Sequence, residues 1–488
     1  MNLEQELAHY FGFKTFHPGQ KAIIEHALKG DAVLGVLPTG SGKSLCYQLP
    51  GLVMHRLTVI VSPLISLMQD QVIQLRQQGQ SKVVALNSTV RKAEQTYILQ
   101  HVKDFDFLFV SPETLGRSDV LLALKQISIG LFVIDEAHCI SQWGVDFRPS
   151  YLQLRHYRQI LKPYSTLMLT ATATPKVQAD ILDKLGLIKQ AVRIITNVDR
   201  PNIFLDTVKV ADDEQRQQLL QTIIKHITWP GIIYFSSRQA AEEVALQLQQ
   251  TLHIPTAFYH GALSNRDRQL IQQRFMTNQI PIICATNAFG MGINKKNIRF
   301  VIHYHAPSSF ESYLQEFGRA GRDGKQSIAI TFITPADAGL QANLLASGLP
   351  STSMIQMFYN EPRLFAHTDD QALELLRDFY SSGLEMTQVQ QMLTAKYQEK
   401  QAALTEFQRY LSAATCKRQL LSDYFGQKAV HSHDDTCCCL GQDEAVLTTL
   451  KKLNLYQRDS TQQPRSLQKA IETPKVVHWQ QTLKQLFE

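Results

Sequence analysis

A glycine-rich loop near the start of the chain has the residues of a phosphate-binding site. Residues 37–44 read Leu-Pro-Thr-Gly-Ser-Gly-Lys-Ser and follow an apolar run that predicts a strand. Glycines let the backbone N–H groups face phosphate oxygens, and a following helix N-terminus adds partial positive charge. The Lys would meet the β- and γ-phosphates, and the last Ser would ligate Mg²⁺. The predicted nucleotide-binding residues are Thr39, Gly40, Ser41, Gly42, Lys43 and Ser44. The alternative, a plain glycine turn, is disfavoured by the intact Gly-Lys-Ser.

Two adjacent carboxylates, Asp135 and Glu136, follow four apolar residues that predict a buried strand. Open α/β sheets bind ligands where their strands end. Here Asp135 would hold Mg²⁺, and Glu136 would orient and deprotonate an attacking water. Two solvated acids capping a helix are the alternative, which the preceding apolar run disfavours.

Two arginines in the second half of the chain have the spacing of groups that stabilise phosphoryl transfer. Arg319 and Arg322 lie three apart and would share one face of a helix, with Gln315 just before them. Arginines from an opposing domain can meet the charge that develops on the γ-phosphoryl oxygens. Lys43, Glu136, Gln315, Arg319 and Arg322 are therefore the predicted catalytic residues. The alternative is an arginine face that forms surface salt bridges.

The elements that must position these residues form two sets of alternating strands and helices. Expected strands of the first set lie at 33–37, 58–61, 83–85, 107–110, 132–134 and 166–169, and those of the second at 231–235, 256–259, 280–285, 300–303 and 328–332. Such alternation predicts parallel sheets with crossover helices. Residues 199–202 are expected to be the linker, and residues 371–424 are expected to be helical. The predicted fold class is α/β: domains at 1–197 and 198–338, a helical subdomain at 339–440, and a short tail at 441–488.

An aromatic and basic segment directly follows the carboxylate pair. Gln142, Trp143, Phe147 and Arg148 lie between Ser141 and Pro149. Aromatic side chains can stack on unpaired bases at about 1–3 kcal/mol each, without regard to sequence. The segment therefore predicts a nucleic-acid contact close to the nucleotide site. Packing of the two aromatic side chains into the core is the alternative.

The overall composition says less about the function of the protein than the motifs do. The 488 residues carry a net charge of +6, which by itself does not distinguish a nucleic-acid binder from any mildly basic protein. No apolar stretch is long enough for a bilayer, and the first residues lack a signal-peptide pattern. The expected location is the cytoplasm, with nucleoid association in a bacterium. Seven cysteines include a late cluster, which in a reducing compartment points to metal.

Together these motifs resemble those of superfamily 2 helicases, and specifically the RecQ family, from about residue 8 to about 440. Residues 11–20 resemble the adenine-reading motif, which implies that Gln20 bonds the adenine edge and Phe13 stacks on the base. His17 stands where the family usually has Arg. The family's DNA-contacting blocks match residues 61–71, 259–263 and 285–295, and residues 141–149 match its aromatic-rich loop. The residues that the resemblance assigns to DNA are Ser62, Ser66, Gln142, Trp143, Phe147, Arg148, His260, Thr286 and Asn287.

The late cysteines resemble the family's zinc subdomain, although here three of them are contiguous. Tetrahedral zinc needs four nitrogen or sulfur ligands. Because neighbouring side chains diverge in an extended chain, Cys416, Cys437 and Cys439 are the expected core. The fourth ligand is expected to be Cys438, His431 or His433. A degenerate site held only by helix packing is the alternative.

The resemblance implies two tandem RecA-like domains and an ATP- and Mg²⁺-dependent DNA helicase with one structural Zn²⁺. It implies 3′→5′ movement on single-stranded DNA, in recombination, repair or replication restart. The expected partners are single-stranded and forked DNA, single-stranded DNA-binding protein or other repair proteins, and no membrane. Complete winged-helix and C-terminal helical domains are expected to be missing, because only 48 residues follow residue 440. The rival hypotheses are an RNA helicase or RNA-remodelling ATPase, and a nucleic-acid-binding scaffold with an inactive motor.

Overall fold

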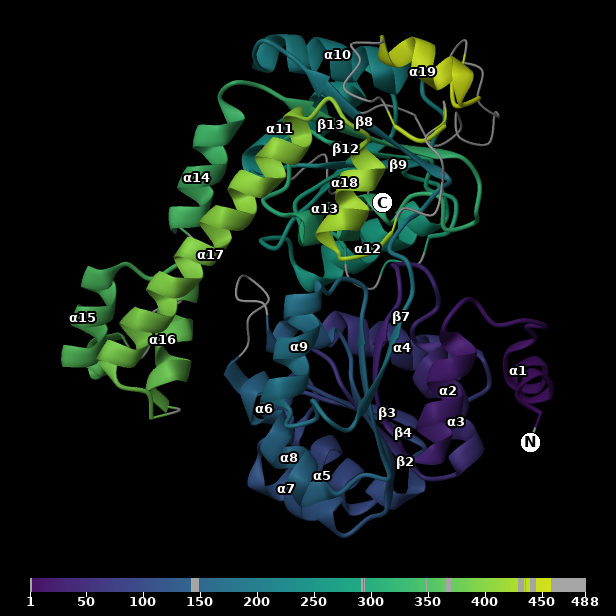
Figure 1. Cartoon of the computed structure of the whole chain (residues 1–488), viewed down its shortest axis with the longest axis vertical. Coiled ribbons are helices and arrows are strands. Elements are labelled where there is room, and N and C mark those ends of the chain that lie inside the picture. Colours follow the sequence, from purple (N-terminus) through teal and green to yellow (C-terminus); the bar gives the residue numbers. More distant parts are fainter. Residues whose placement is uncertain are drawn as a thin grey trace.

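Two parallel β-sheets, each covered by helices, form the body of the protein in the computed structural model (Figure 1). The structure describes residues 2–141, 149–290, 293, 295–347, 349–365, 370–381, 383–428, 434, 436–438 and 445–457. Among these, no helix is both long and apolar enough to cross a bilayer.

The first sheet has seven strands in the order β3-β4-β2-β5-β6-β1-β7, and all its pairs are parallel. Every residue of the central strand β5 is buried, as expected for a strand covered on both faces. The strands are β1 (Ala32–Val36), β2 (Leu57–Val61), β3 (Val83–Leu86), β4 (Phe107–Val110), β5 (Ile129–Ile134), β6 (Ser165–Thr170) and β7 (Ala191–Ile195).

Helices and short 3₁₀ turns cover both faces of this sheet, with an apolar cluster on each side. The helices are α1 (Leu3–Phe11), α2 (Gln20–Lys29), α3 (Leu45–Met54), α4 (Ile65–Gln77), α5 (Lys92–Gln100), α6 (Pro112–Leu115), α7 (Ser118–Lys125), α8 (Leu154–Leu161) and α9 (Pro175–Lys184). The 3₁₀ turns are η1 (Val102–Asp104), η2 (Ala137–Ile140) and η3 (Pro149–Gln153).

The second sheet has six parallel strands in the order β10-β11-β9-β12-β13-β8. Its strands are β8 (Ile203–Lys209), β9 (Gly231–Tyr234), β10 (Thr256–Tyr259), β11 (Ile282–Ala285), β12 (Phe300–His303) and β13 (Ser327–Ile333). The helices around it are α10 (Asp213–His226), α11 (Arg238–Leu252), α12 (Asn265–Met276) and α13 (Phe310–Phe317). The fold class predicted from the sequence is confirmed, with the two edge strands β7 and β8 added to those expected.

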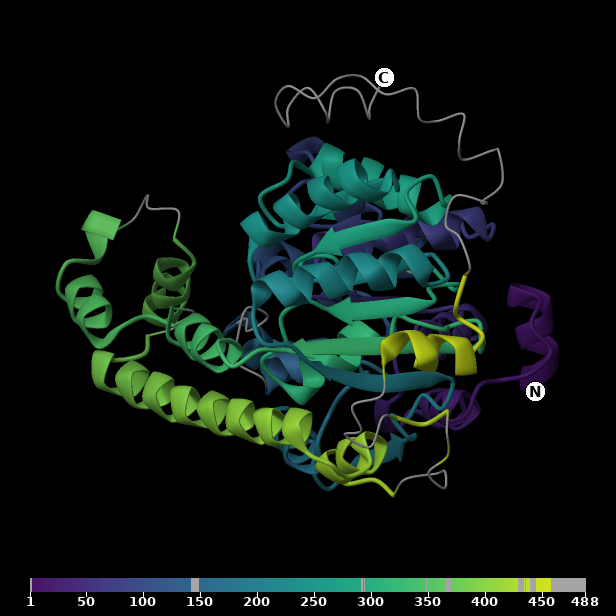
Figure 2. The same cartoon turned by 90° about the horizontal axis from the view of Figure 1, so that it is seen from above.

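A helical arm leaves the second sheet and reaches down beside the first (Figures 1 and 2). It consists of α14 (Asp337–Ser347), α15 (Thr352–Asn360), the 3₁₀ turn η4 (Pro362–Phe365), α16 (Gln371–Ser381) and the 27-residue α17 (Met386–Ser412). At its root, Phe407 and Tyr410 of α17 make edge-to-face contacts with the ring of Phe310 of α13. Near its far end the arm packs against Leu152 of η3. At the middle of α17, Glu399 pairs with Lys176 of α9 at 2.8 Å.

Two short helices after the arm return the chain to the second sheet. α18 (Lys417–Tyr424) packs beside α13, and α19 (Val446–Lys452) lies along α10 (Figure 1). Val446 and Leu450 of α19 are buried in the apolar cluster of this sheet. The N–H of Thr228 donates to the carbonyl of Leu455 at 2.8 Å. The described start of the segment that was predicted to be a tail therefore packs onto the second domain as part of it.

Candidate functional site

The glycine-rich loop links β1 to α3 in the way that its sequence predicts. Gly40 and Gly42 adopt φ values of +85° and +72°, in the left-handed region that glycine enters without a steric penalty. α3 then begins at Leu45, with Ser44 at its N-cap. The loop residues thus curl at the end of a buried strand and before a helix, which is the geometry of a phosphate cradle.

Gln20 has a different surrounding from the one that the family resemblance implies. It is 1% exposed, and its Nε2 donates to the carbonyls of Ser41 at 2.8 Å and Gly42 at 3.0 Å. Its Oε1 accepts from the N–H of His17 at 2.8 Å. In this conformation the amide ties the preceding segment to the glycine-rich loop, and its contact with adenine stays a prediction. Phe13 is 52% exposed and His17 is exposed, so both remain open to a nucleotide.

Asp135 and Glu136 follow β5 at the same edge of the sheet as the glycine-rich loop. Burial and the negative Glu136 raise the pKa of Asp135 to about 7. Burial alone would raise the pKa of Glu136. The positive charge of Lys43 and smaller contributions of His138 and Arg319 together outweigh burial and lower the pKa of Glu136 overall. Lys43 therefore lies close enough to affect both carboxylates. A divalent cation would relieve the repulsion that holds Asp135 partly protonated, and the Asp135 carboxylate with the Ser44 hydroxyl is an oxygen set that suits Mg²⁺.

Glu136 is also connected to the second sheet through buried polar side chains. Its backbone is strained at φ +48°, and its Oε2 lies 3.3 Å from Nδ1 of His138. That ring nitrogen lies 2.9 Å from Oγ1 of Thr170 at the end of β6. Two residues later, Thr172 Oγ1 accepts from Nε2 of Gln315 at 3.5 Å. Gln315 is therefore placed across the seam between the two domains.

Arg319 and Arg322 face this same region, but they do not lie on a helix. α13 ends at Phe317, and both arginines belong to the turn at residues 318–324, which Gly321 enters at φ +54°. The prediction of a shared helix face is therefore wrong. The turn brings Arg322 onto the glycine-rich loop: a Cβ added to Gly40 would lie 2.9 Å from its Cγ.

Neither arginine forms an ion pair among the described residues, which contradicts the surface salt-bridge alternative. Arg319 donates to the carbonyl of Gly290, and Arg322 donates to that of Ile293 at 2.6 Å. The Nε atoms of both are buried without a hydrogen-bond partner. Burial, followed by repulsion from Arg319 and Arg200, lowers the pKa of Arg322. Arg200, Arg319 and Arg322 therefore lie close enough to repel one another, as expected for a site that receives an anion.

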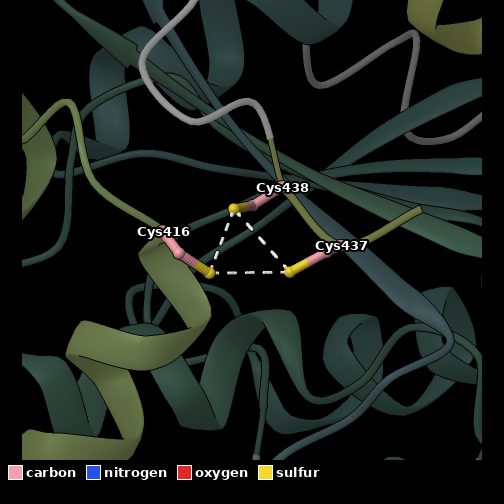
Figure 3. Close-up of side chains that lie close together, drawn as sticks. All are labelled: Cys416, Cys437 and Cys438. Atoms are coloured by element: carbon pink, nitrogen blue, oxygen red, sulfur yellow. Dashed lines mark hydrogen bonds between the residues drawn. The ribbon is translucent and has the colours of Figure 1, made fainter. Parts of the chain in front are cut away.

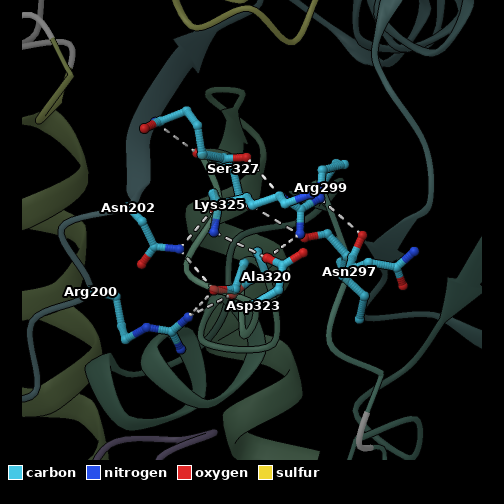
Figure 4. A network of polar contacts seen from close by, with 11 residues as sticks. Arg200, Asn202, Asn297, Arg299, Ala320, Asp323, Lys325 and Ser327 are labelled. Carbon is cyan, nitrogen blue, oxygen red and sulfur yellow. Dashed lines mark hydrogen bonds and ion pairs between the residues drawn. The ribbon is translucent and has the colours of Figure 1, made fainter.

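Arg200, which the sequence analysis treated only as part of a linker, also reaches this seam. Its Nη1 donates to the carbonyls of Thr39 at 3.0 Å and Gly318 at 2.9 Å. Its Nη2 donates to the carbonyls of Ala320 and Gly321 at 2.9 and 2.8 Å (Figure 4). The only sequence signal for such a role is a charged residue at the expected domain junction.

The residues that the resemblance assigns to DNA are divided between the surface and the interior. Ser66 at the start of α4 and Asn287 are exposed. Thr286 is 9% exposed, Ser62 is 1% exposed, and His260 is 4% exposed and bonded to Glu242 at 2.7 Å. The structure therefore does not support direct contact of Ser62 or His260 with DNA, because both side chains are buried where a β-strand ends. Gln142, Trp143, Phe147 and Arg148 lie outside the described residues.

Three cysteines converge beside α18, where Cys416 is the N-cap (Figure 3). Their Sγ atoms are 3.7 Å apart for Cys416 and Cys437, 3.6 Å for Cys416 and Cys438, and 3.8 Å for Cys437 and Cys438. Sulfurs bound to one tetrahedral zinc at about 2.3 Å would be about 3.8 Å apart. A hydrogen bond from Cys438, assisted by Arg418, lowers the pKa of Cys437, which favours the thiolate that binds metal.

Three of the four predicted cysteines, Cys416, Cys437 and Cys438, lie together among the described residues, so Cys438, which was expected only as a possible fourth ligand, belongs to this group. A turn at Thr436 and Cys437 lets the neighbouring side chains of Cys437 and Cys438 converge, which an extended chain would not allow. Cys439, His431 and His433 lie outside the described residues, so no described residue supplies a fourth ligand.

Comparisons with known proteins agree with this geometry. A model of DEAD/DEAH box helicases matches residues 17–181, and one of the helicase conserved C-terminal domain matches residues 214–324. The probable ATP-dependent DNA helicase RecS of Bacillus subtilis (strain 168) is 40% identical over 455 residues, which are 90% of this chain and 91% of that protein.

Other relatives are similar over less of the chain or of their own length. The ATP-dependent DNA helicase RecQ of Haemophilus influenzae is 40% identical over 69% of this chain, which spans 54% of that protein. The putative ATP-dependent RNA helicase R290 of Acanthamoeba polyphaga mimivirus is 34% identical over 89% of this chain and 72% of its own length. The Mycobacterium smegmatis helicase Lhr, solved with ssDNA and AMP-PNP, shares the fold at a TM-score of 0.57 and 19% identity, over 78% of this chain and 55% of Lhr.

Proposed function

Because this chain belongs to the RecQ-type ATP-dependent DNA helicases, we propose that it translocates 3′→5′ on single-stranded DNA and unwinds duplexes during recombination, repair or replication restart. The observation that carries the motor assignment is the seam between the sheets. A glycine-rich loop and two carboxylates lie on one side of it, and two arginines that form no ion pair among the described residues approach from the other. Single-stranded and forked DNA are the proposed partners, with single-stranded DNA-binding protein or other repair proteins as protein partners.

We assign the hydrolytic roles as follows. Lys43 and the backbone of residues 39–44 hold the phosphates, while Asp135 and Ser44 hold Mg²⁺. Glu136, whose pKa is lowered, stays ionised and takes a proton from the attacking water. Arg319 and Arg322 meet the charge on the γ-phosphoryl group, and Gln315 passes the state of the site to Thr172. Hydrolysis therefore requires the two domains to be closed.

We assign contact with DNA to the exposed Ser66 and Asn287 and to the aromatic segment with Trp143. Ser141, which precedes the aromatic segment, lies five residues after Glu136, so DNA contact and hydrolysis share a short connection. We expect Trp143→Ala to weaken stimulation of ATP hydrolysis by DNA more than it weakens ATP affinity. Unchanged stimulation would assign the segment a structural role only.

We also propose that Cys416, Cys437 and Cys438 bind one structural Zn²⁺, with the fourth ligand taken from Cys439, His431 or His433. The support is the match of the three sulfur separations to a tetrahedral site and the thiolate-favouring surroundings of Cys437. When bound, zinc would link α18 to the segment beside β8.

Unwinding of 3′-tailed, 5′-tailed and forked duplexes tests activity and polarity together. We expect the 3′-tailed and forked substrates to be opened and the 5′-tailed one to remain closed. Opening of only the 5′-tailed duplex would refute the polarity. Absence of DNA-stimulated ATP hydrolysis would favour the scaffold with an inactive motor.

An RNA substrate is the second candidate, because one relative similar over 89% of the chain is named a putative RNA helicase. ATP hydrolysis stimulated by matched DNA and RNA oligonucleotides separates the two. Stronger stimulation by RNA would replace DNA as the proposed substrate.

A further inference from the structure

The segment between the two sheets contains one arginine that contacts both domains. Arg200 follows β7 and precedes β8, and its guanidinium reaches four carbonyl oxygens. Thr39 belongs to the glycine-rich loop of the first domain, whereas Gly318, Ala320 and Gly321 belong to the turn that carries Arg319 and Arg322. One side chain thus joins the phosphate cradle to the arginines that face it.

The acceptors of Arg200 leave its charge without a direct ion pair. Among the described residues its hydrogen bonds all go to carbonyls, and burial lowers its pKa although Asp199 and Asp323 oppose that change. A half-buried guanidinium held only by carbonyl dipoles is costly to keep for packing alone. Its planar fork, however, can hold several acceptors in a fixed relation, which a lysine ammonium cannot do.

The backbone that carries Arg200 is fixed from the opposite side. Arg418 of α18 pairs with Asp199 and donates to the carbonyl of Ile203 at 2.7 Å. Gln427 accepts from the N–H of Val198 at 2.8 Å and donates to the carbonyl of Thr196 at 3.1 Å. These contacts hold both sides of Arg200, so its guanidinium is presented to the seam by an anchored segment.

We propose that Arg200 is a positioning residue for hydrolysis, an inference that rests on the proposed function. It holds the turn with Arg319 and Arg322 against the glycine-rich loop when the domains are closed, and it does so without touching the nucleotide. Opening of the domains separates Thr39 from Gly318, so the bond of Nη1 to both is available only in the closed state. Arg200 should therefore set the rate of the chemical step more than the affinity for ATP.

The test is steady-state ATP hydrolysis by the full chain with saturating oligothymidylate, comparing wild type with Arg200→Ala and Arg200→Lys. We expect kcat to fall about 10- to 100-fold in both variants, as for a misplaced catalytic group, with KM for ATP within about threefold. Lysine should fail to restore the rate because it retains the charge but not the four-acceptor geometry.

Asn202→Ala is the matched control. The Asn202 amide donates to the carbonyls of Gly321 at 2.8 Å and Lys325 at 2.9 Å, so it supports the same turn without reaching the first domain (Figure 4). We expect this variant to lose less than about threefold in kcat. A loss equal to that of Arg200→Ala would show that general loosening of the turn is the cause and would overturn the proposal.

Other outcomes are equally decisive. Wild-type kcat in Arg200→Ala, full rescue by lysine, or a rise in KM without a fall in kcat would each refute the positioning role. If Arg200→Ala fails to fold, as judged by thermal unfolding, the lysine variant decides alone. Lack of hydrolysis by the wild-type chain would refute the proposed function itself. An active wild type with equally active Arg200 variants would refute only the positioning role.

Discussion

Replacing Gly40 with alanine should displace Arg322 from the glycine-rich loop and slow hydrolysis. The new Cβ would lie 2.9 Å from Cγ, 3.1 Å from Cδ and 3.2 Å from Nε of Arg322. Carbon atoms pack at about 3.5–4.0 Å, so the arginine stem must move by roughly 0.6 Å or more. Because Arg322 is held at the carbonyl of Ile293, that movement would shift the guanidinium itself.

Two contributions to the effect can be separated. Alanine at φ +85° costs about 1–2 kcal/mol of stability for the backbone alone. The displaced guanidinium should lower kcat about 10- to 100-fold, equivalent to about 1.4–2.7 kcal/mol of transition-state stabilisation. Gly79→Ala is the control for the first contribution, since Gly79 has a φ of +89° and open space where the Cβ would be.

The assay is DNA-stimulated ATP hydrolysis by Gly40→Ala, Arg322→Ala and the double variant, with thermal unfolding recorded for each. If the alanine acts through Arg322, the double variant should be no slower than Arg322→Ala alone. Multiplicative losses would show that the methyl group disturbs the phosphate cradle directly and would refute the reasoning. Gly79→Ala should lose stability but keep its kcat.

Three further outcomes can be measured on the same protein. Lys43→Ala should lower kcat at least about 100-fold while single-stranded DNA binding, followed by fluorescence anisotropy, stays within about threefold; normal turnover would disprove the nucleotide site. Cys416→Ser should reduce the zinc content per chain, measured by elemental mass spectrometry, and lower the unfolding temperature; wild-type protein purified without added zinc and found metal-free would rule out the site. Burial lowers the pKa of Lys295 to about 8, so the unfolded chain binds more protons between about pH 8 and 10.5, and the free energy of unfolding should rise across that range. Lys295→Met should remove about 2–3 kcal/mol of this rise in denaturant titrations, and an identical pH dependence in both proteins would contradict the assignment.

The parts of the site that the sequence predicted are those encoded by local pattern. The glycine-rich loop and Asp135 with Glu136 each follow an uninterrupted apolar strand, so the sequence also predicts their place at the sheet edge. Residues 371–424 were expected to be helical, and within them Phe407 and Leu411 of α17 repeat at helical spacing and are buried. Such features depend on neighbours within a few residues, which a single sequence contains.

The parts that it did not predict depend on contacts between distant segments. β7 is half exposed at the edge of its sheet, and β8 contains the polar Asp206, so neither shows the apolar run that identified the central strands. The partners of Arg200 lie about 120 and 160 residues away in the chain. The convergence of Cys438 with Cys437 depends on a turn that no residue pattern announces.

The helical arm is attached unequally at its two ends, and this has a mechanical consequence. Its root is held by edge-to-face contacts between aromatic rings. Its described contacts with the first domain include the partly buried Leu152 and an exposed ion pair between Lys176 and Glu399, of a kind worth about 0–1 kcal/mol. The arm should therefore move with the second domain as one rigid body. At 1.5 Å per residue, α17 is about 40 Å long, so a rotation of about 10° would move its far end by roughly 7 Å. A small rotation between the two domains would thus move the far end of the arm by a distance comparable to the spacing of nucleotides in a DNA strand.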